Sequence, residues 1–98
     1  MRVILSDQAK AGLREITLYI ARDNKARARS FMRQILAKTR ELGDMPRAFP
    51  LVQRYEHHGI RRRPYRDYLI FYRVEDDRVA VIHILHGATD YEPLLFPE

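Results

Sequence analysis

Residues 68–86 read YLIFYRVEDDRVAVIHILH and decide the fold, because two apolar segments flank a short polar stretch. Residues 68–74 and 79–86 are rich in aromatic and β-branched side chains, which is typical of strands. The charged residues 75–78 between them have the length of a hairpin turn. The second segment is almost continuously apolar, so we expect it to lie at the centre of a sheet with both faces buried.

Two further strands are predicted around this hairpin. Residues 60–65 precede it, and Pro64 places them at a sheet edge because proline has no N–H to donate. Side chains alternate along a strand, so Arg61 and Arg63 are expected on one face and Arg62 on the other. Residues 3–5 form a short apolar run near the N-terminus, which reads as a buried strand.

Two amphipathic helices are predicted between the first strand and the loop that begins at residue 43. Ser6 and Asn24 are suitable N-cap residues for them. The apolar positions recur every three or four residues, which is a helical period, at Ala9, Leu13, Ile16 and Ile20, and then at Ala28, Phe31, Ile35, Thr39 and Leu42. We expect Gly43 to end the second helix in a left-handed conformation.

Residues 43–59 have no clear period and contain two prolines and two glycines, so they are predicted to be a loop. Phe49, Leu51 and Val52 are expected to pin this loop to the core. The order strand, helix, helix, strand, strand, strand predicts one α+β domain over residues 1–98. It contains an N-terminal strand, an antiparallel helical hairpin and a three-stranded antiparallel sheet, and the first strand must join that sheet at long range.

The charge of the chain is uneven. The 98 residues carry a formal net charge of +5, yet residues 1–73 hold 17 basic and 7 acidic side chains whereas residues 74–98 hold one basic and six acidic ones. Fifteen of the 18 cations are arginines, which favour planar, bidentate recognition. We therefore expect an acidic partner, and composition alone leaves both nucleic acid and an acidic protein surface open.

Several classes of protein are excluded or disfavoured. The chain has no cysteine, so disulfides, thiolate metal sites and a cysteine nucleophile are excluded. No apolar run approaches the ~20 residues that span a bilayer, and we expect a cytoplasmic protein. His83 and His86 are expected on opposite faces of a strand, and His57 and His58 have no helical partner, so neither a metal nor a cofactor is predicted.

The block from Arg61 to Val74 (RRRPYRDYLIFYRV) resembles the basic, aromatic hairpin of the ParE toxins in the RelE/ParE superfamily, and residues 84–90 (ILHGATD) resemble the end of its last strand. The size, the helical hairpin and the proline-containing loop agree over essentially the whole chain. The resemblance implies the toxin of a type II toxin–antitoxin pair. It also implies a ParD-like antitoxin as partner, with a possible hetero-oligomer of the two.

The two branches of the superfamily act differently: ParE-like members inhibit DNA gyrase, and RelE-like members cut mRNA on the ribosome. In RelE-like toxins, arginines at the start of the penultimate strand and beyond the last strand serve the cleavage. The matching positions here are Leu69 and the pair Ala88-Thr89, and the tail is acidic at Asp90 and Glu92. This favours a ParE-like gyrase inhibitor without catalysis of its own, which would meet nucleic acid only through its target.

The residues expected to bind target or antitoxin lie on and beside the hairpin, at Arg61, Arg62, Arg63, Tyr65, Arg66 and Arg73. Tyr65 is expected to be the most exposed tyrosine of this block. An acidic partner within the chain, Glu75, Asp90 or Glu92, is expected to pair with Arg73, because an unpaired buried charge is costly.

Three alternatives stay open at this point. In a RelE-like endoribonuclease, Arg62, Arg66 and His86 would have to improvise the catalytic site. The chain could also be an interaction module or a degenerate toxin. Residues 91–98 could either fold back on the sheet or offer Leu94, Leu95 and Phe96 to a partner.

Overall fold

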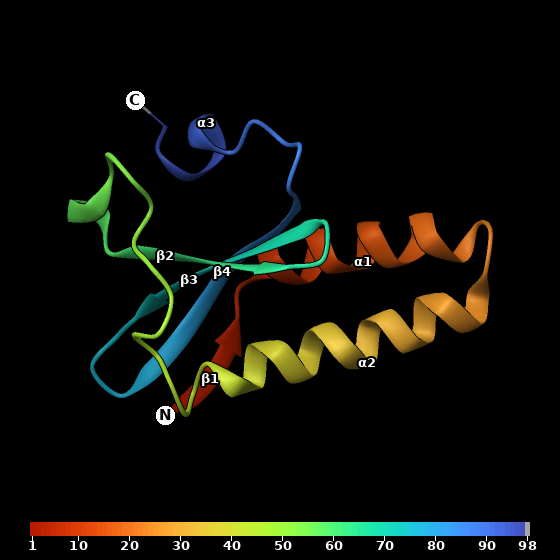
Figure 1. The fold of residues 1–98 in the computed structure, drawn as a ribbon, viewed down its shortest axis with the longest axis horizontal. Coiled ribbons are helices and arrows are strands. Elements are labelled where there is room, and N and C mark those ends of the chain that lie inside the picture. Colours follow the sequence, from red (N-terminus) through yellow and green to blue (C-terminus); the bar gives the residue numbers. More distant parts are fainter. Residues whose placement is uncertain (98) are drawn as a thin grey trace.

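The computed structural model describes residues 1–97, in which a four-stranded sheet carries two long helices on one face (Figure 1). The strands are β1 (Arg2–Leu5), β2 (Ile60–Tyr65), β3 (Tyr68–Val74) and β4 (Arg78–His86), in the order β1-β4-β3-β2. The helices are α1 (Asp7–Ala21), α2 (Lys25–Glu41) and the short α3 (Glu92–Leu95), with a 3₁₀ turn at Glu56–His58. The predicted α+β order is confirmed.

Strand β4 lies inside the sheet, as its apolar sequence predicts. It pairs in parallel with β1 and antiparallel with β3, so β1 joins the sheet at long range. On the helix side, Val81 and Ile84 are completely buried with Leu13 of α1. On the other side, Ile82 and Leu85 pack on a second, smaller cluster. Both faces of β4 are therefore covered.

A β-bulge interrupts the pairing of β3 with β4. Phe71 pairs with His83 but Tyr72 pairs with Val81, which leaves Ile82 without an opposite residue. Ser6 is tied to this bulge, because its N–H donates to the Val81 carbonyl (2.9 Å) and its Oγ donates to the Ile82 carbonyl (2.8 Å). The same Oγ accepts the Ala9 N–H at 3.0 Å, which is the predicted N-cap of α1. One serine thus fixes the start of α1 against the central strand.

The helical hairpin forms as its apolar spacing predicts, with one exception at its end. Asn24 caps α2 by accepting the Arg27 N–H at 3.0 Å. The left-handed conformation expected for Gly43 is wrong, since Gly59 is the glycine with positive φ (73°) in residues 1–97. A Cβ on Gly43 would instead meet the Met1 carbonyl and lie 3.2 Å from Cγ2 of Val3. Glycine is needed there for close approach to β1.

The loop after α2 and the C-terminal segment cover the second face of the sheet. Residues 50–52 pair with β2, since the Val52 N–H donates to the Ile60 carbonyl at 2.9 Å and the Arg62 N–H donates to the Pro50 carbonyl at 3.0 Å. This pairing protects part of an edge strand. Residues 91–97 fold back on the sheet, and Phe96 is buried while Leu94 is 50% exposed. No helix of residues 1–97 is both long and apolar enough to cross a membrane.

The close approach of α1 to β4 gives a stability prediction at Gly12. A Cβ at this position would lie 2.5 Å from the Ile84 carbonyl oxygen, so Gly12→Ala must push the helix off the central strand. We expect a loss of about 1–3 kcal/mol in the free energy of unfolding, although alanine gains ~1 kcal/mol of helix propensity. Urea unfolding measures it. The control is Ala11→Gly at the exposed neighbouring position, and a Gly12→Ala protein more stable than the parent would contradict the close contact.

A pH dependence is predicted for His83, which is half-buried on the second face. Burial lowers the pKa of its imidazole below the ordinary value of 6.5. The unfolded chain therefore binds a proton more readily than the folded protein, and stability must fall as pH falls from about 6.5 toward the lowered folded pKa. In thermal melts across this range, His83→Gln should remove this component of the slope. An unchanged slope in the variant would assign the effect to another group.

Candidate functional site

The three consecutive arginines of β2 are divided between the two faces of the sheet. Arg61 and Arg63 pair with Tyr72 and Ile70 of β3, and they lie on the helix side. Arg62 pairs with Phe71 and lies on the opposite side, as the alternation predicts. The triplet therefore presents no single row of charge to a partner.

Arg63 is a structural residue, since its side chain is buried between α2 and the loop. The guanidinium donates to the Lys38 carbonyl at 2.9 Å and to Glu41 Oε1 at 2.8 Å, and its carbon lies 4.7 Å from the centre of the Phe49 ring. The hydrogen bond from Arg63 holds the pKa of the Glu41 carboxyl below its ordinary value. The last helical turn has unpaired carbonyls, and Arg63 satisfies that of Lys38.

Arg61 and Arg73 also contact the backbone. The Arg61 guanidinium donates to the Phe49 carbonyl at 2.7 Å, which fastens the loop to β2. Arg73 Nε donates to the His58 carbonyl at 3.4 Å. The expected pairing of Arg73 with a carboxylate is wrong, because Glu75 pairs with Arg78 at 2.6 Å and no carboxylate of residues 1–97 forms an ion pair with Arg73. The hairpin turn brings Glu75 and Arg78 together.

Arg62 lies at a cavity of about 420 Å³ on the second face, formed by residues 50–54 of the loop and the start of α3. Its guanidinium is 3.5 Å from the Tyr91 hydroxyl, which is a long hydrogen bond. Arg54 lines the same cavity and has a left-handed backbone, with φ of 76°. Glu92 is the acid in this lining, so two cations face one carboxylate. The cavity is suited to an additional anionic group.

Tyr65 and Arg66 lie at the other end of the hairpin, where the β2–β3 turn approaches α2. Tyr65 is half-buried, and its ring packs on Phe31 with 6.2 Å between centres. Its hydroxyl donates to Gln34 Oε1 at 2.7 Å and accepts from Arg66 Nε at 3.2 Å. Tyr65 is therefore a positioned, partly covered side chain, whereas Tyr72 is completely buried.

Sequence reasoning missed the contribution of α2 to this end of the site. Gln34 binds Tyr65, and Arg27 lies two turns earlier on the same helix face. The signal is available in the sequence, since Arg27, Ser30 and Gln34 are spaced by three and four residues beside the apolar stripe. Nothing local in the sequence shows that the β2–β3 turn lies against that face.

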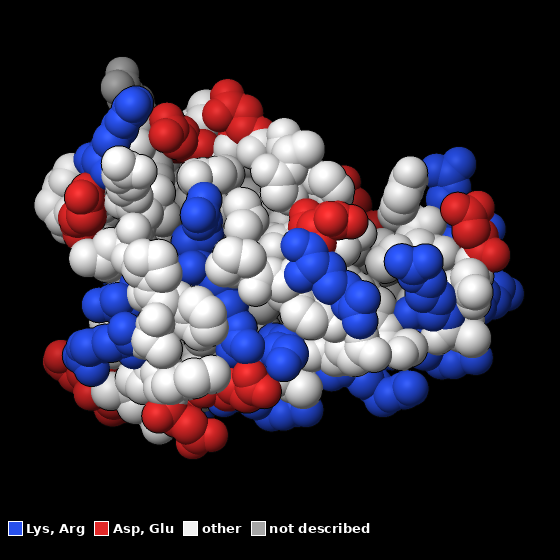
Figure 2. Space-filling model, viewed as in Figure 1, with Lys and Arg blue, Asp and Glu red and all other residues white. Residues whose placement is uncertain are grey.

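The residues of the nuclease alternative are not brought together. His86 lies on the helix side with its ring 5.4 Å from that of Tyr68, and its Nδ1 accepts the Ala88 N–H at 3.0 Å. Arg62 projects from the opposite side of the sheet, and Arg66 lies at the turn. Figure 2 shows the same dispersion of charge: basic side chains are spread over the helices and the sheet with acidic groups between them.

Comparisons with known proteins give one family match and one match in fold. A family model described as the ParE toxin of the type II toxin–antitoxin system parDE matches residues 3–91. A solved structure described as the chromosomal ParDE toxin–antitoxin system from P. aeruginosa is similar in fold, with a TM-score of 0.73 and 16% sequence identity. That match covers 88% of this chain and 95% of the other. The comparison with curated proteins gives no match.

The buried position of Arg63 predicts that its loss weakens the fold. Arg63→Ala removes two hydrogen bonds to charged or carbonyl groups and the contact with Phe49, so we expect about 2 kcal/mol less stability. Differential scanning calorimetry should show this as a fall of roughly 10 °C in Tm. The matched control is Arg29→Ala on the exposed side of α2, and an equal effect of the two substitutions would refute the structural role.

Proposed function

The chain belongs to the ParE toxin family of type II toxin–antitoxin systems, and from this we propose that it inhibits DNA gyrase by binding and is neutralised by a cognate antitoxin. The family match over residues 3–91 carries the proposal. A fold shared with mRNA-cleaving relatives does not distinguish the two activities, so the side chains must.

The arrangement of side chains supports action by binding rather than by chemistry of its own. Leu69, at the position where the resemblance puts an arginine in nucleases, is almost completely buried in the second core cluster. Arg62 and His86 lie on opposite sides of the sheet, so these two residues and Arg66 do not form an acid, a base and a cation around one phosphate. Transition-state stabilisation needs donors converging on one reacting group.

Arg62 is our candidate for the gyrase contact. Its guanidinium has one long hydrogen bond, to Tyr91, and it lies at an open cavity beside Arg54. Arg61 and Arg63, in contrast, already bind the loop and α2 within the chain. An arginine with free donors can form bidentate hydrogen bonds with an acidic group of a partner.

The helical hairpin is our candidate for the antitoxin contact. Leu18 and Tyr19 of α1 are 62% and 67% exposed, so they form a small exposed apolar surface beside basic side chains of α1 and α2. An amphipathic segment of the antitoxin could cover these side chains and pair with the cations. The toxin and antitoxin would then form a hetero-oligomer.

The gyrase proposal predicts a direct effect of the purified protein. Added to gyrase, ATP and relaxed plasmid, it should prevent supercoiling and accumulate cleaved plasmid. Arg62→Glu should weaken this effect at least ~10-fold, because reversal of one contacting charge costs more than ~1.4 kcal/mol. Arg29→Glu, with the same charge change on the exposed side of α2, is the matched control.

Other outcomes would assign another function. Unchanged supercoiling together with codon-phased cuts in mRNA after induction would identify a ribosome-dependent endoribonuclease. Normal growth after induction without antitoxin, with gyrase unaffected, would identify a binding module without toxicity. Equal effects of Arg62→Glu and Arg29→Glu would leave gyrase as target but remove Arg62 from the contact.

A further inference from the structure

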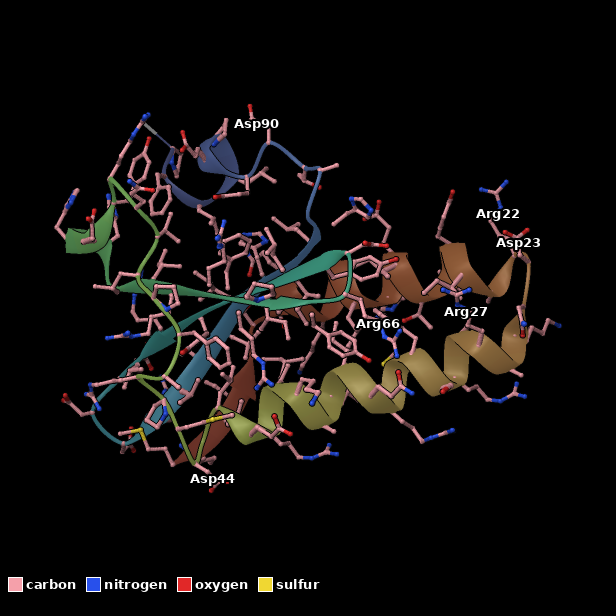
Figure 3. All side chains as sticks on the ribbon, in the orientation of Figure 1. Arg22, Asp23, Arg27, Asp44, Arg66 and Asp90 are labelled. Atoms are coloured by element: carbon pink, nitrogen blue, oxygen red, sulfur yellow. The ribbon has the colours of Figure 1, made fainter. Side chains whose placement is uncertain are left out.

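A cleft of about 230 Å³ separates the β2–β3 turn from α2 and the end of α1. Its polar lining comes from Arg27, Ser30 and Gln34 of α2 and from Arg66 and Asp67 of the turn. Figure 3 shows Arg27 and Arg66 on the same side of the molecule, over the space between the two long helices. Within residues 1–97, neither of these two guanidinium groups forms an ion pair.

Hydrogen bonds around the cleft run in one direction. Arg66 Nε donates to the Tyr65 hydroxyl, which donates to Gln34 Oε1, and Gln34 Nε2 donates to Ser30 Oγ at 3.3 Å. Each oxygen in this series of hydrogen bonds accepts from the group before it. The Ser30 hydroxyl proton and the terminal nitrogens of Arg66 therefore remain as donors, and the Asp67 carboxylate is the acceptor in the same lining.

Both cations of the cleft lack a carboxylate partner. Within residues 1–97 the Arg27 guanidinium has no hydrogen bond or ion pair, and Arg66 contacts only Tyr65, whose ring centre is 5.6 Å from its guanidinium carbon. The hydrogen bond to the Tyr65 hydroxyl also raises the pKa of Arg66 above its ordinary value, so the group stays charged. Two positive charges with free donors favour one anionic group between them.

The surroundings favour a carboxylate over a nucleic-acid backbone. Ile20, Phe31 and Tyr68 form apolar walls, against which the methylene groups of a glutamate or a neighbouring apolar side chain can pack. Asp67, at the turn, belongs to the lining of the cleft, and Asp23 lies outside the cleft at the tip of the helical hairpin. A chain of phosphates that passes through the cleft and on along the helical hairpin would approach both carboxylates, whereas a single carboxylate between Arg27 and Arg66 stays away from Asp23.

We propose that this cleft binds the carboxylate of an aspartate or glutamate in a partner polypeptide, through Arg27, Arg66 and the Ser30 hydroxyl, with an adjacent apolar side chain against Phe31. The partner is the antitoxin of the proposed function, and in that respect the assignment rests on it. The cleft lies on the helix side of the sheet, apart from Arg62 on the opposite side. Antitoxin and target would therefore bind different arginines.

The test uses defined peptides and the whole protein, labelled with ¹⁵N for NMR. Acetyl-Leu-Glu-Leu-amide should shift the amide signals of residues 27–34 and 66 and the Nε–H signals of Arg27 and Arg66. Acetyl-Leu-Gln-Leu-amide should bind about 10-fold more weakly, because it lacks the charge that makes the hydrogen bonds strong. Arg27→Gln and Arg66→Gln should each cause a similar loss. Arg29→Gln, on the opposite face of α2, should cause none.

Two results would overturn the assignment. Equal binding of the glutamate and glutamine peptides would mean that no carboxylate is recognised. Stronger shifts of the same signals with a twelve-residue oligothymidylate would identify nucleic acid as the occupant. Since neither titration contains gyrase, failure here leaves the supercoiling result standing, and failure of gyrase inhibition leaves peptide binding measurable. Unchanged melting temperatures of the exposed-site variants would show that any loss of binding is local.

Discussion

The double burial of β4 is the constraint from which the arrangement of the other elements follows. Its two edges are bonded to β1 and β3, so neither can pair with another chain. Its two faces require two covers, which α1 and α2 supply on one side and the loop and tail supply on the other. The bulge at Ile82 places Val81 and Ile84 on the helix side and Ile82 and Leu85 on the other side. Ser6, the N-cap of α1, donates a hydrogen bond to the carbonyl of Ile82.

The arginines of the hairpin serve two different purposes, which the sequence does not distinguish. Arg61 and Arg63 satisfy backbone carbonyls at places where the chain changes direction, so their charges are used within the fold. Arg62 and Arg66 keep most of their donors free and lie on different sides of the sheet. Adjacent residues in a strand point to opposite faces, so a dense cluster in sequence becomes two separate sites in space.

Periodicity predicts the two long helices and the strands, and residue type predicts the N-caps, because those features depend on neighbours within a few residues. The role of Gly43 cannot be predicted in this way, since the need for glycine there comes from contact with Met1 and Val3. The bulge at Ile82 likewise arises from pairing across strands. For the site, the sequence indicates the arginines of the hairpin. The contribution of Gln34 depends on how α2 packs against the β2–β3 turn, which no local pattern predicts.

The parallel pairing of β1 with β4 also has a consequence for synthesis on the ribosome. Ser6 binds a carbonyl 76 positions later in the chain, so β1 has no strand to pair with and α1 has no sheet to pack on until β4 has left the exit tunnel. A nascent chain of strand and helices alone exposes its apolar stripes and lacks the completed hairpin. The protein therefore acquires its binding surfaces together, when β4 joins the sheet, and a partner can recognise them only from that point.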